Sequence, residues 1–139
     1  MKKLIVLFVS VMFILTGCKN DLIGEKSNIK IDDNDIEFTL VKDSLTNTGA
    51  SCILKNNSDK TLYYGTPWEI EIYDEGTWKK MNVEMVFNMP LMELKSRKEI
   101  KLNFDWEHSH GKLKGKYRII KDVYFENEEK FFIACEFEV

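Results

Sequence analysis

Apolar and polar residues alternate along four stretches of this chain, at residues 36–40, 68–72, 100–106 and 131–139. A period of two places successive side chains on opposite faces of a β-strand. The apolar set is therefore expected to face a core, and the charged residues between them, such as Glu69 and Glu71, are expected to face water. No segment shows the period of an amphipathic helix, and the chain is predicted to be all-β.

Turn signals separate these stretches. Residues 56–59 (Asn-Asn-Ser-Asp), 65–67 (Gly-Thr-Pro) and 74–77 (Asp-Glu-Gly-Thr) lie between strand-like segments, and the last of these is typical of a hairpin. Gly111 and Gly115 interrupt the approach to the final strands. About seven short strands at this spacing predict one antiparallel β-sandwich over residues 36–139.

One short motif favours an immunoglobulin-like version of the sandwich. Leu113, Gly115 and Tyr117 occupy alternate positions just before the strand-like residues 118–120. In immunoglobulin folds a tyrosine at this point bonds back to the backbone a few residues upstream, and a glycine frees the sharp bend. Leu113 would then plug the end of the core. The alternative is an ordinary buried tyrosine at the start of a strand.

The N-terminus has the pattern of a secretion signal. A positive start (Lys2, Lys3) precedes an uncharged apolar run at residues 4–15, which is shorter than the roughly 20 residues that a membrane-spanning helix needs. The next residues, Leu15-Thr16-Gly17-Cys18, resemble the lipobox of bacterial lipoproteins. The resemblance implies a signal peptide over residues 1–17, cleavage before Cys18, and a diacylglyceryl group on the Cys18 sulfur. Two acyl chains suffice for stable anchoring.

Composition limits the partners of the mature chain. Residues 18–35 are mostly polar and have no sustained period, so we expect Cys18 to be followed by a tether that lifts the domain off the membrane. Without Lys2 and Lys3, 18 basic side chains remain against 23 acidic ones, a formal charge of −5. This balance excludes a nucleic-acid partner. Abundant Lys, Ile and Asn favour an AT-rich, Gram-positive source, and hence the extracytoplasmic face of its cell membrane.

Several segments together resemble a bacterial immunoglobulin-like domain family. The resemblance covers most of residues 50–123, and Lys114 stands where the family often has proline. It implies a fold and a surface location, and it brings no catalytic residues. The segments are Asn56-Asn57-Ser58-Asp59, Tyr64-Gly65, Gly76-Thr77-Trp78 and Leu113-Lys114-Gly115-Lys116-Tyr117-Arg118-Ile119-Ile120.

Two cysteines remain besides Cys18. Antibody domains carry a cysteine two residues after the corner tyrosine, bonded to the second strand, but Ile119 holds that place here. Cys52 lies on the candidate second strand and Cys135 on the last one. A Cys52–Cys135 disulfide across the core and two buried thiols acting as small apolar residues are both compatible with the sequence.

Little in the sequence points to catalysis. His108 and His110 are the only histidines, and a transition-metal site would need further ligands. No serine elbow and no phosphate-binding glycine loop is present, so we expect no cofactor and no enzymatic activity. The alternative is a small metal-binding or hydrolytic accessory protein of the envelope that uses His108 and His110.

The remaining candidates are contact residues. Met85, Met89 and Met92 lie in an irregular segment broken by Pro90, and methionines suit adaptable binding surfaces. They equally suit a crossover packed on the edge of the sandwich. Trp78, just past the hairpin, is a further candidate for contact or for packing. We expect a membrane-anchored, non-enzymatic binding or structural module whose partner is an unknown envelope protein or ligand.

Overall fold

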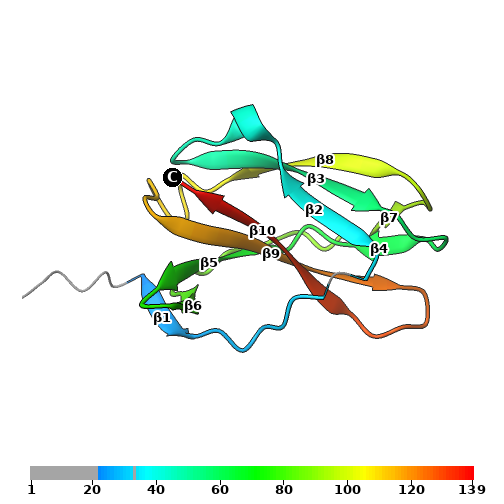
Figure 1. Cartoon of the computed structure of the whole chain (residues 1–139), viewed down its shortest axis with the longest axis horizontal. Helices are drawn as coiled ribbons and strands as arrows, with labels where there is room; N and C mark the ends of the chain where they lie inside the picture. Colours follow the sequence, from blue (N-terminus) through cyan, green and yellow to red (C-terminus); the bar gives the residue numbers. More distant parts are fainter. Residues whose placement is uncertain (1–21, 33) are drawn as a thin grey trace, which may run out of the picture.

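The computed structural model describes residues 22–32 and 34–139 and arranges them as two antiparallel β-sheets packed face to face (Figure 1). The predicted signal peptide (1–17) and Cys18 lie outside the described residues. The elements are β1 (Ile23–Lys26), β2 (Ile36–Leu40), the 3-10 turn η1 (Lys42–Ser44), β3 (Gly49–Asn56), β4 (Leu62–Tyr64), β5 (Glu69–Asp74), β6 (Thr77–Met81), β7 (Met92–Leu94), β8 (Glu99–Asp105), β9 (Lys116–Phe125) and β10 (Phe131–Glu138). Within this part of the chain no helix is long and apolar enough to cross a membrane.

The two sheets differ in size. The small sheet has the order β2-β3-β8, and the large sheet holds the other seven strands. In the large sheet β9 pairs with β10 on one side, and with both β4 and β5 on the other. Strand β5 continues to β6 and β1, whereas β4 continues to β7. The all-β sandwich predicted from the alternation is confirmed.

The core lies between the sheets. Along the β9–β10 ladder Tyr117 faces Phe137 and Ile119 faces Cys135, so that alternate residues of both strands enter the same layer. The buried apolar cluster comprises Ile36, Phe38, Ala50, Cys52, Leu54, Leu62, Tyr64, Ile70, Ile72, Leu94, Phe104, Trp106, Leu113, Tyr117, Ile119, Val123, Phe125, Ile133, Cys135 and Phe137. Nine of these twenty residues belong to the four alternating stretches, and they come from both sheets, which is why that pattern predicted the architecture.

The described residues form ten strands rather than about seven. Strand β7 has only three residues, too few to show a period of two, and β1 lies in the segment that was predicted to be a tether. The stretch predicted to begin at Trp68 begins as a strand at Glu69, after a bend that contains Pro67. Proline has no backbone N–H to give to a ladder, which separates β4 from β5.

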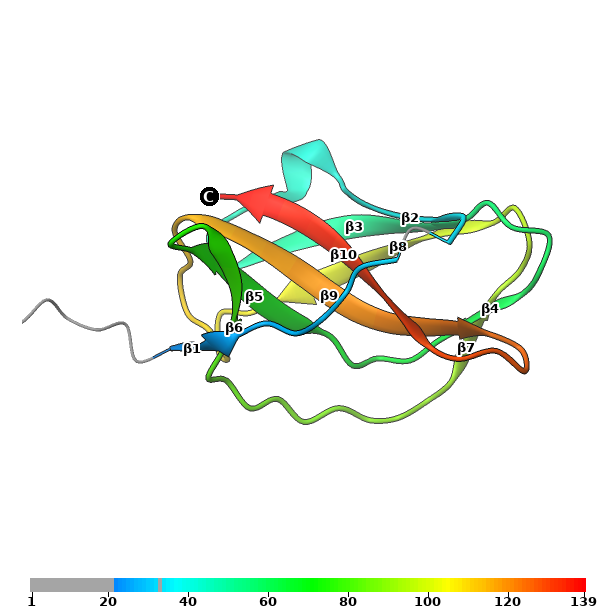
Figure 2. The same cartoon turned by 60° about the horizontal axis from the view of Figure 1, so that its bottom comes forward.

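Residues 18–35 were predicted to be a tether, but the part from Leu22 to Asp32 is attached to the large sheet. Strand β1 pairs with β6, and Ile31 forms a parallel bridge with Phe132 of β10. Between these points the chain crosses the face of the large sheet that is turned away from the small sheet (Figures 1 and 2). Backbone hydrogen bonds attach this segment to the sheet. For example, the Ser27 N–H donates to the Trp78 carbonyl at 2.9 Å. Such bonds are independent of side-chain type, so a polar, aperiodic segment can make them.

The close approach of β1 to the sheet favours a glycine. A Cβ atom at Gly24 would lie 2.7 Å from Oδ1 of Asn82 and 3.0 Å from the Lys80 carbonyl oxygen. The segment is therefore built against the sheet and is part of the domain.

Candidate functional site

The connection between β6 and β7, residues 82–91, is the most exposed apolar segment of the described chain. We call it the contact loop. Val86 is 99% exposed, Met89 80% and Leu91 58%, which makes them the three most accessible large apolar side chains among the described residues. Figure 2 shows the loop running along the lower edge of the molecule, away from the strands. These exposed apolar side chains make the contact loop the candidate interaction surface of the described chain.

The contact loop is held at several points. The amide of Asn82 donates to the Leu22 carbonyl at 2.7 Å, and the hydroxyl of Thr66 donates to the Asn88 carbonyl. Phe87 packs edge-on against Trp68, with ring centroids 6.1 Å apart. Between these points Val86 and Met89 project into solvent, so the loop presents them from a fixed base.

Two hollows flank the contact loop. The larger, about 570 Å³, is the Trp68 hollow, and the smaller, about 150 Å³, is the Tyr124 hollow. The Trp68 hollow is lined by Trp68, Glu84, Met85, Val86, Phe87, Asp105, His108 and Ser109. The Tyr124 hollow is lined by Tyr64, Gly65, Pro67, Met89, Pro90, Leu91, Asp122 and Tyr124. Residues of the contact loop line both hollows, so the loop and the two hollows form one surface. This surface combines aromatic rings, apolar side chains and a few carboxylates.

The structure separates the sequence-predicted contact residues. Met85 and Met89 lie in the contact loop, and each lines one of the hollows. Met92 is half-buried in β7 and packs against the core. Trp78 is half-buried on β6, where its ring packs edge-on against Tyr73. The Arg118 guanidinium lies over the same ring, 4.5 Å from its centroid. Trp78 therefore packs within the domain.

The two histidines occupy different environments. His108 is exposed and lines the Trp68 hollow. His110 is buried and stacks on Trp68, and its Nδ1 lies 2.7 Å from the Ser109 hydroxyl. Burial lowers the pKa of His110. No group of three or more His, Cys, Asp or Glu that could hold a metal ion occurs in residues 22–32 and 34–139.

The Leu113–Gly115–Tyr117 motif forms a bend at the start of β9. The Tyr117 hydroxyl donates to the Lys114 carbonyl at 3.0 Å, and Gly115 has a φ of +123°, which favours glycine. Leu113 is buried at this end of the core. Gly115 and Val139 also exchange two backbone hydrogen bonds, which fix the C-terminus to the same bend.

A family model described as bacterial Ig-like domain matches residues 32–138. The chain belongs to this family. No curated protein matches it. The family match starts after β1, so the segment that crosses the large sheet lies outside the matched Ig-like domain.

The Ig-like domain holds Cys52 and Cys135 as free, buried thiols. Their sulfur atoms lie 3.1 Å apart. The two side chains point at each other across the core as thiols, and the disulfide that the sequence left open stays a prediction.

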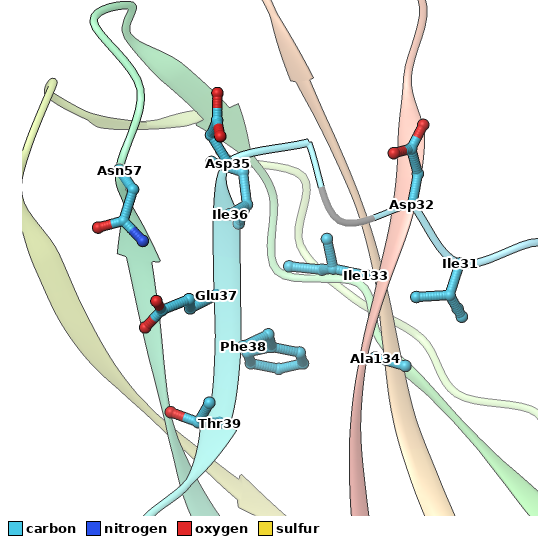
Figure 3. Close-up of a pocket in the computed structure, with 10 residues that line it drawn as sticks. All are labelled: Ile31, Asp32, Asp35, Ile36, Glu37, Phe38, Thr39, Asn57, Ile133 and Ala134. Atoms are coloured by element: carbon cyan, nitrogen blue, oxygen red, sulfur yellow. The ribbon is translucent and has the colours of Figure 1, made fainter.

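A groove of about 480 Å³ lies where the chain passes from the large sheet to the small one (Figure 3). Its floor is apolar, with Phe38 and Ile133 facing each other. Its carboxylates do not converge, because Glu37 projects from the opposite side of β2 to Phe38 and away from Asp32. The groove therefore lacks a gathered set of charged groups with which to bind an ion.

Sequence reasoning missed Val86, Leu91 and Tyr124 as members of the candidate surface. Val86 and Leu91 sit in the apolar run from Met85 to Met92, which contains one asparagine and one proline and does not alternate. The signal available in the sequence was an apolar run that contains a proline and does not have a period of two. Tyr124 alternates with core residues of β9, and only the fold places it beside the loop.

A buried lysine compensates for the break between β4 and β5. Tyr64 and Glu69 are five positions apart in the sequence, whereas the β9 residues that they pair with are only three positions apart. Nζ of Lys121 donates to the carbonyls of Gly65 and Pro67 in this bend, at 2.8 and 2.9 Å. Burial lowers the pKa of Lys121 to about 8. Lys121 thus donates hydrogen bonds to two backbone carbonyls that the bend withdraws from the pairing of the strands.

This lysine predicts a rise in stability at alkaline pH. The unfolded chain keeps the Lys121 proton up to an ordinary pKa of 10.5, whereas the folded chain loses it near 8. Between these values the unfolded state binds more protons, so stability increases with pH. From about pH 8 to about pH 9.5, we expect the free energy of unfolding of the wild type, relative to Lys121→Met, to rise by on the order of 1 kcal/mol. Urea unfolding at several pH values measures this difference, and a difference that stays level or falls would contradict the prediction.

Proposed function

We propose that this chain is an extracytoplasmic bacterial lipoprotein, in which diacylglyceryl-Cys18 holds a non-enzymatic Ig-like binding module at the membrane surface. The observation that carries the binding role is the contact loop, with Val86, Met89 and Leu91 exposed on a domain whose other large apolar side chains are mostly buried. Leaving three apolar side chains in water is unfavourable by about 25 cal/mol per Å² of apolar area. A partner that covers them recovers this free energy.

The position of β1 supports a membrane-proximal location for the contact loop. Three residues separate Cys18 from Leu22, and four Cα–Cα steps span at most about 14 Å. The Leu22 carbonyl accepts the amide of Asn82, the first residue of the contact loop. An acyl group on Cys18 would therefore keep the start of the loop close to the bilayer.

The partner class follows from the same surface. Methionines and a proline-broken loop adapt to differently shaped apolar partners, and the acidic balance of the mature chain disfavours nucleic acid. We therefore expect an envelope protein that presents an apolar segment close to the membrane surface.

Anchoring is tested by Cys18→Ser. The serine variant has no thiol to acylate, so we expect it to move from the membrane fraction to the soluble extracytoplasmic fraction, while its thermal unfolding matches that of the wild type. Fractionation followed by immunoblotting measures this. A serine variant that is processed and yet stays with the membrane would refute the anchor.

Binding is tested with a contact-loop variant, Val86→Ser/Met89→Ser/Leu91→Ser. The full-length protein is crosslinked in cells, solubilised in detergent and purified, and its partners are identified by mass spectrometry. The matched control is Ile100→Ser, which changes an exposed apolar residue of the small sheet. We expect the wild type and the control to retain the same partner and the loop variant to lose it. Equal retention by the loop variant, or turnover of an envelope substrate by the purified domain, would refute the binding role.

A further inference from the structure

The two buried cysteines face each other across the sandwich. Cys52 lies in β3 of the small sheet and Cys135 in β10 of the large sheet, 83 residues apart in sequence. Their exposed fractions are 0% and 2%, and the two Sγ atoms are 3.1 Å apart. A disulfide has an S–S distance of about 2.05 Å, so closing the bond requires a movement of about 1 Å, which small side-chain rotations supply.

The strand register explains why these two positions meet. In antibody domains the inter-sheet bond joins the second strand to the position two residues after the corner tyrosine. That position is Ile119 here, and the β9–β10 ladder pairs Ile119 directly with Cys135. Cys135 therefore lies at the same level of the core as Ile119, on the neighbouring strand β10. From this position its sulfur approaches Cys52 of β3.

We propose that Cys52 and Cys135 become joined by a disulfide that links the two sheets when the chain meets a disulfide oxidant outside the cytoplasm. One cysteine, as its thiolate, attacks a sulfur of the oxidant, forming a mixed disulfide and releasing one oxidant thiol. The second cysteine then attacks the first cysteine's sulfur, forming the Cys52–Cys135 bond and releasing the second oxidant thiol. The pair loses two electrons and two protons, and the oxidant disulfide gains them.

The burial of the pair indicates when this reaction takes place. The Cys52 thiol donates a hydrogen bond to the Cys135 sulfur, and this bond and burial both raise the pKa of Cys52, whereas thiol–disulfide exchange requires a thiolate. The closed sandwich therefore reacts slowly, and the bond forms while the C-terminal strand β10 is docking. Once formed, it is shielded from reductants by the same core.

The bond closes a long loop and should stabilise the domain measurably. Cross-links that close long loops give the largest expected stabilisation. We expect the Tm of the oxidised protein to exceed that of the reduced protein by on the order of 10 °C.

The decisive experiment maps the bond in the full-length chain. The protein is refolded in a mixture of oxidised and reduced glutathione, alkylated with N-ethylmaleimide under denaturing conditions, and digested without reductant. We expect a linked pair of peptides containing Cys52 and Cys135, lighter than the two free peptides by two hydrogen atoms. Recovery of both cysteines as alkylated peptides would overturn the proposal. The Cys18→Ser chain serves as a control that removes the third thiol.

Variants supply an independent readout. Cys52→Ala, Cys135→Ala and the double variant should all lose the Tm difference between oxidising and reducing conditions, whereas the Cys18→Ser control should keep it. A difference that persists in the double variant would assign the effect to something other than this bond. If the alanine variants fail to fold, the peptide map of the wild type still decides. None of these outcomes depends on the lipid anchor or on the contact loop.

Discussion

Replacing Trp106 with alanine is expected to lower the free energy of unfolding by about 3–5 kcal/mol. Trp106 is fully buried at the end of β8. Its ring stacks on Phe137 of β10, with centroids 5.1 Å apart, and its indole N–H donates to the Asn47 carbonyl at 2.9 Å. One side chain therefore joins the end of the small sheet, the last strand of the large sheet and the loop before β3. Its loss leaves a cavity and removes one of two hydrogen bonds that the Asn47 carbonyl accepts, the other coming from the Leu113 amide at 2.8 Å.

Trp106→Phe separates these two contributions. Phenylalanine keeps most of the packing on Phe137 but cannot donate to Asn47, so we expect a smaller loss, about 1–3 kcal/mol. Urea unfolding followed by far-ultraviolet circular dichroism measures both variants without depending on tryptophan fluorescence. An alanine variant as stable as the phenylalanine variant would contradict the packing role assigned to the ring.

The second large effect is expected at the buried pair Glu71–Arg118. Glu71 is fully buried, and its Oε1 accepts Nε and Nη2 of Arg118 at 2.9 and 2.5 Å. Its Oε2 has no hydrogen-bond partner among the described residues. Arg118→Met would leave the carboxylate buried without a counter-charge. We expect this to lower the free energy of unfolding by about 3–5 kcal/mol.

The double variant Glu71→Leu/Arg118→Met is the matched control. It removes both charges and keeps apolar volume, so we expect it to recover most of the stability that Arg118→Met loses. Arg118→Lys retains the charge but loses the two-pronged bond and the stacking on Trp78, and should fall between the two. Denaturant unfolding at neutral pH ranks the three variants. A single Arg118→Met variant that is as stable as the wild type would show that Glu71 does not depend on Arg118.

The same glutamate shows where a period-two pattern stops being informative. The alternation along β5 was confirmed for Ile70 and Ile72, which enter the core. The expectation that Glu71 faces water was wrong. Glu71 does lie on the outer face of the large sheet, but the N-terminal segment crosses this face, and Arg118 and Trp78 pack there. Alternation identifies the face of a side chain, but it does not reveal what covers that face.

The sequence alone determined the class of fold, because period two, turn residues and the resemblance around Tyr117 are local properties of short segments. The tertiary structure alone decided the docking of β1 on β6, the exposure of Val86 and Met89, and the meeting of Cys52 with Cys135. Each of these depends on backbone segments that are tens of residues apart in sequence. Their juxtaposition is set by strand order and register, which the hydrophobicity of a single segment does not specify.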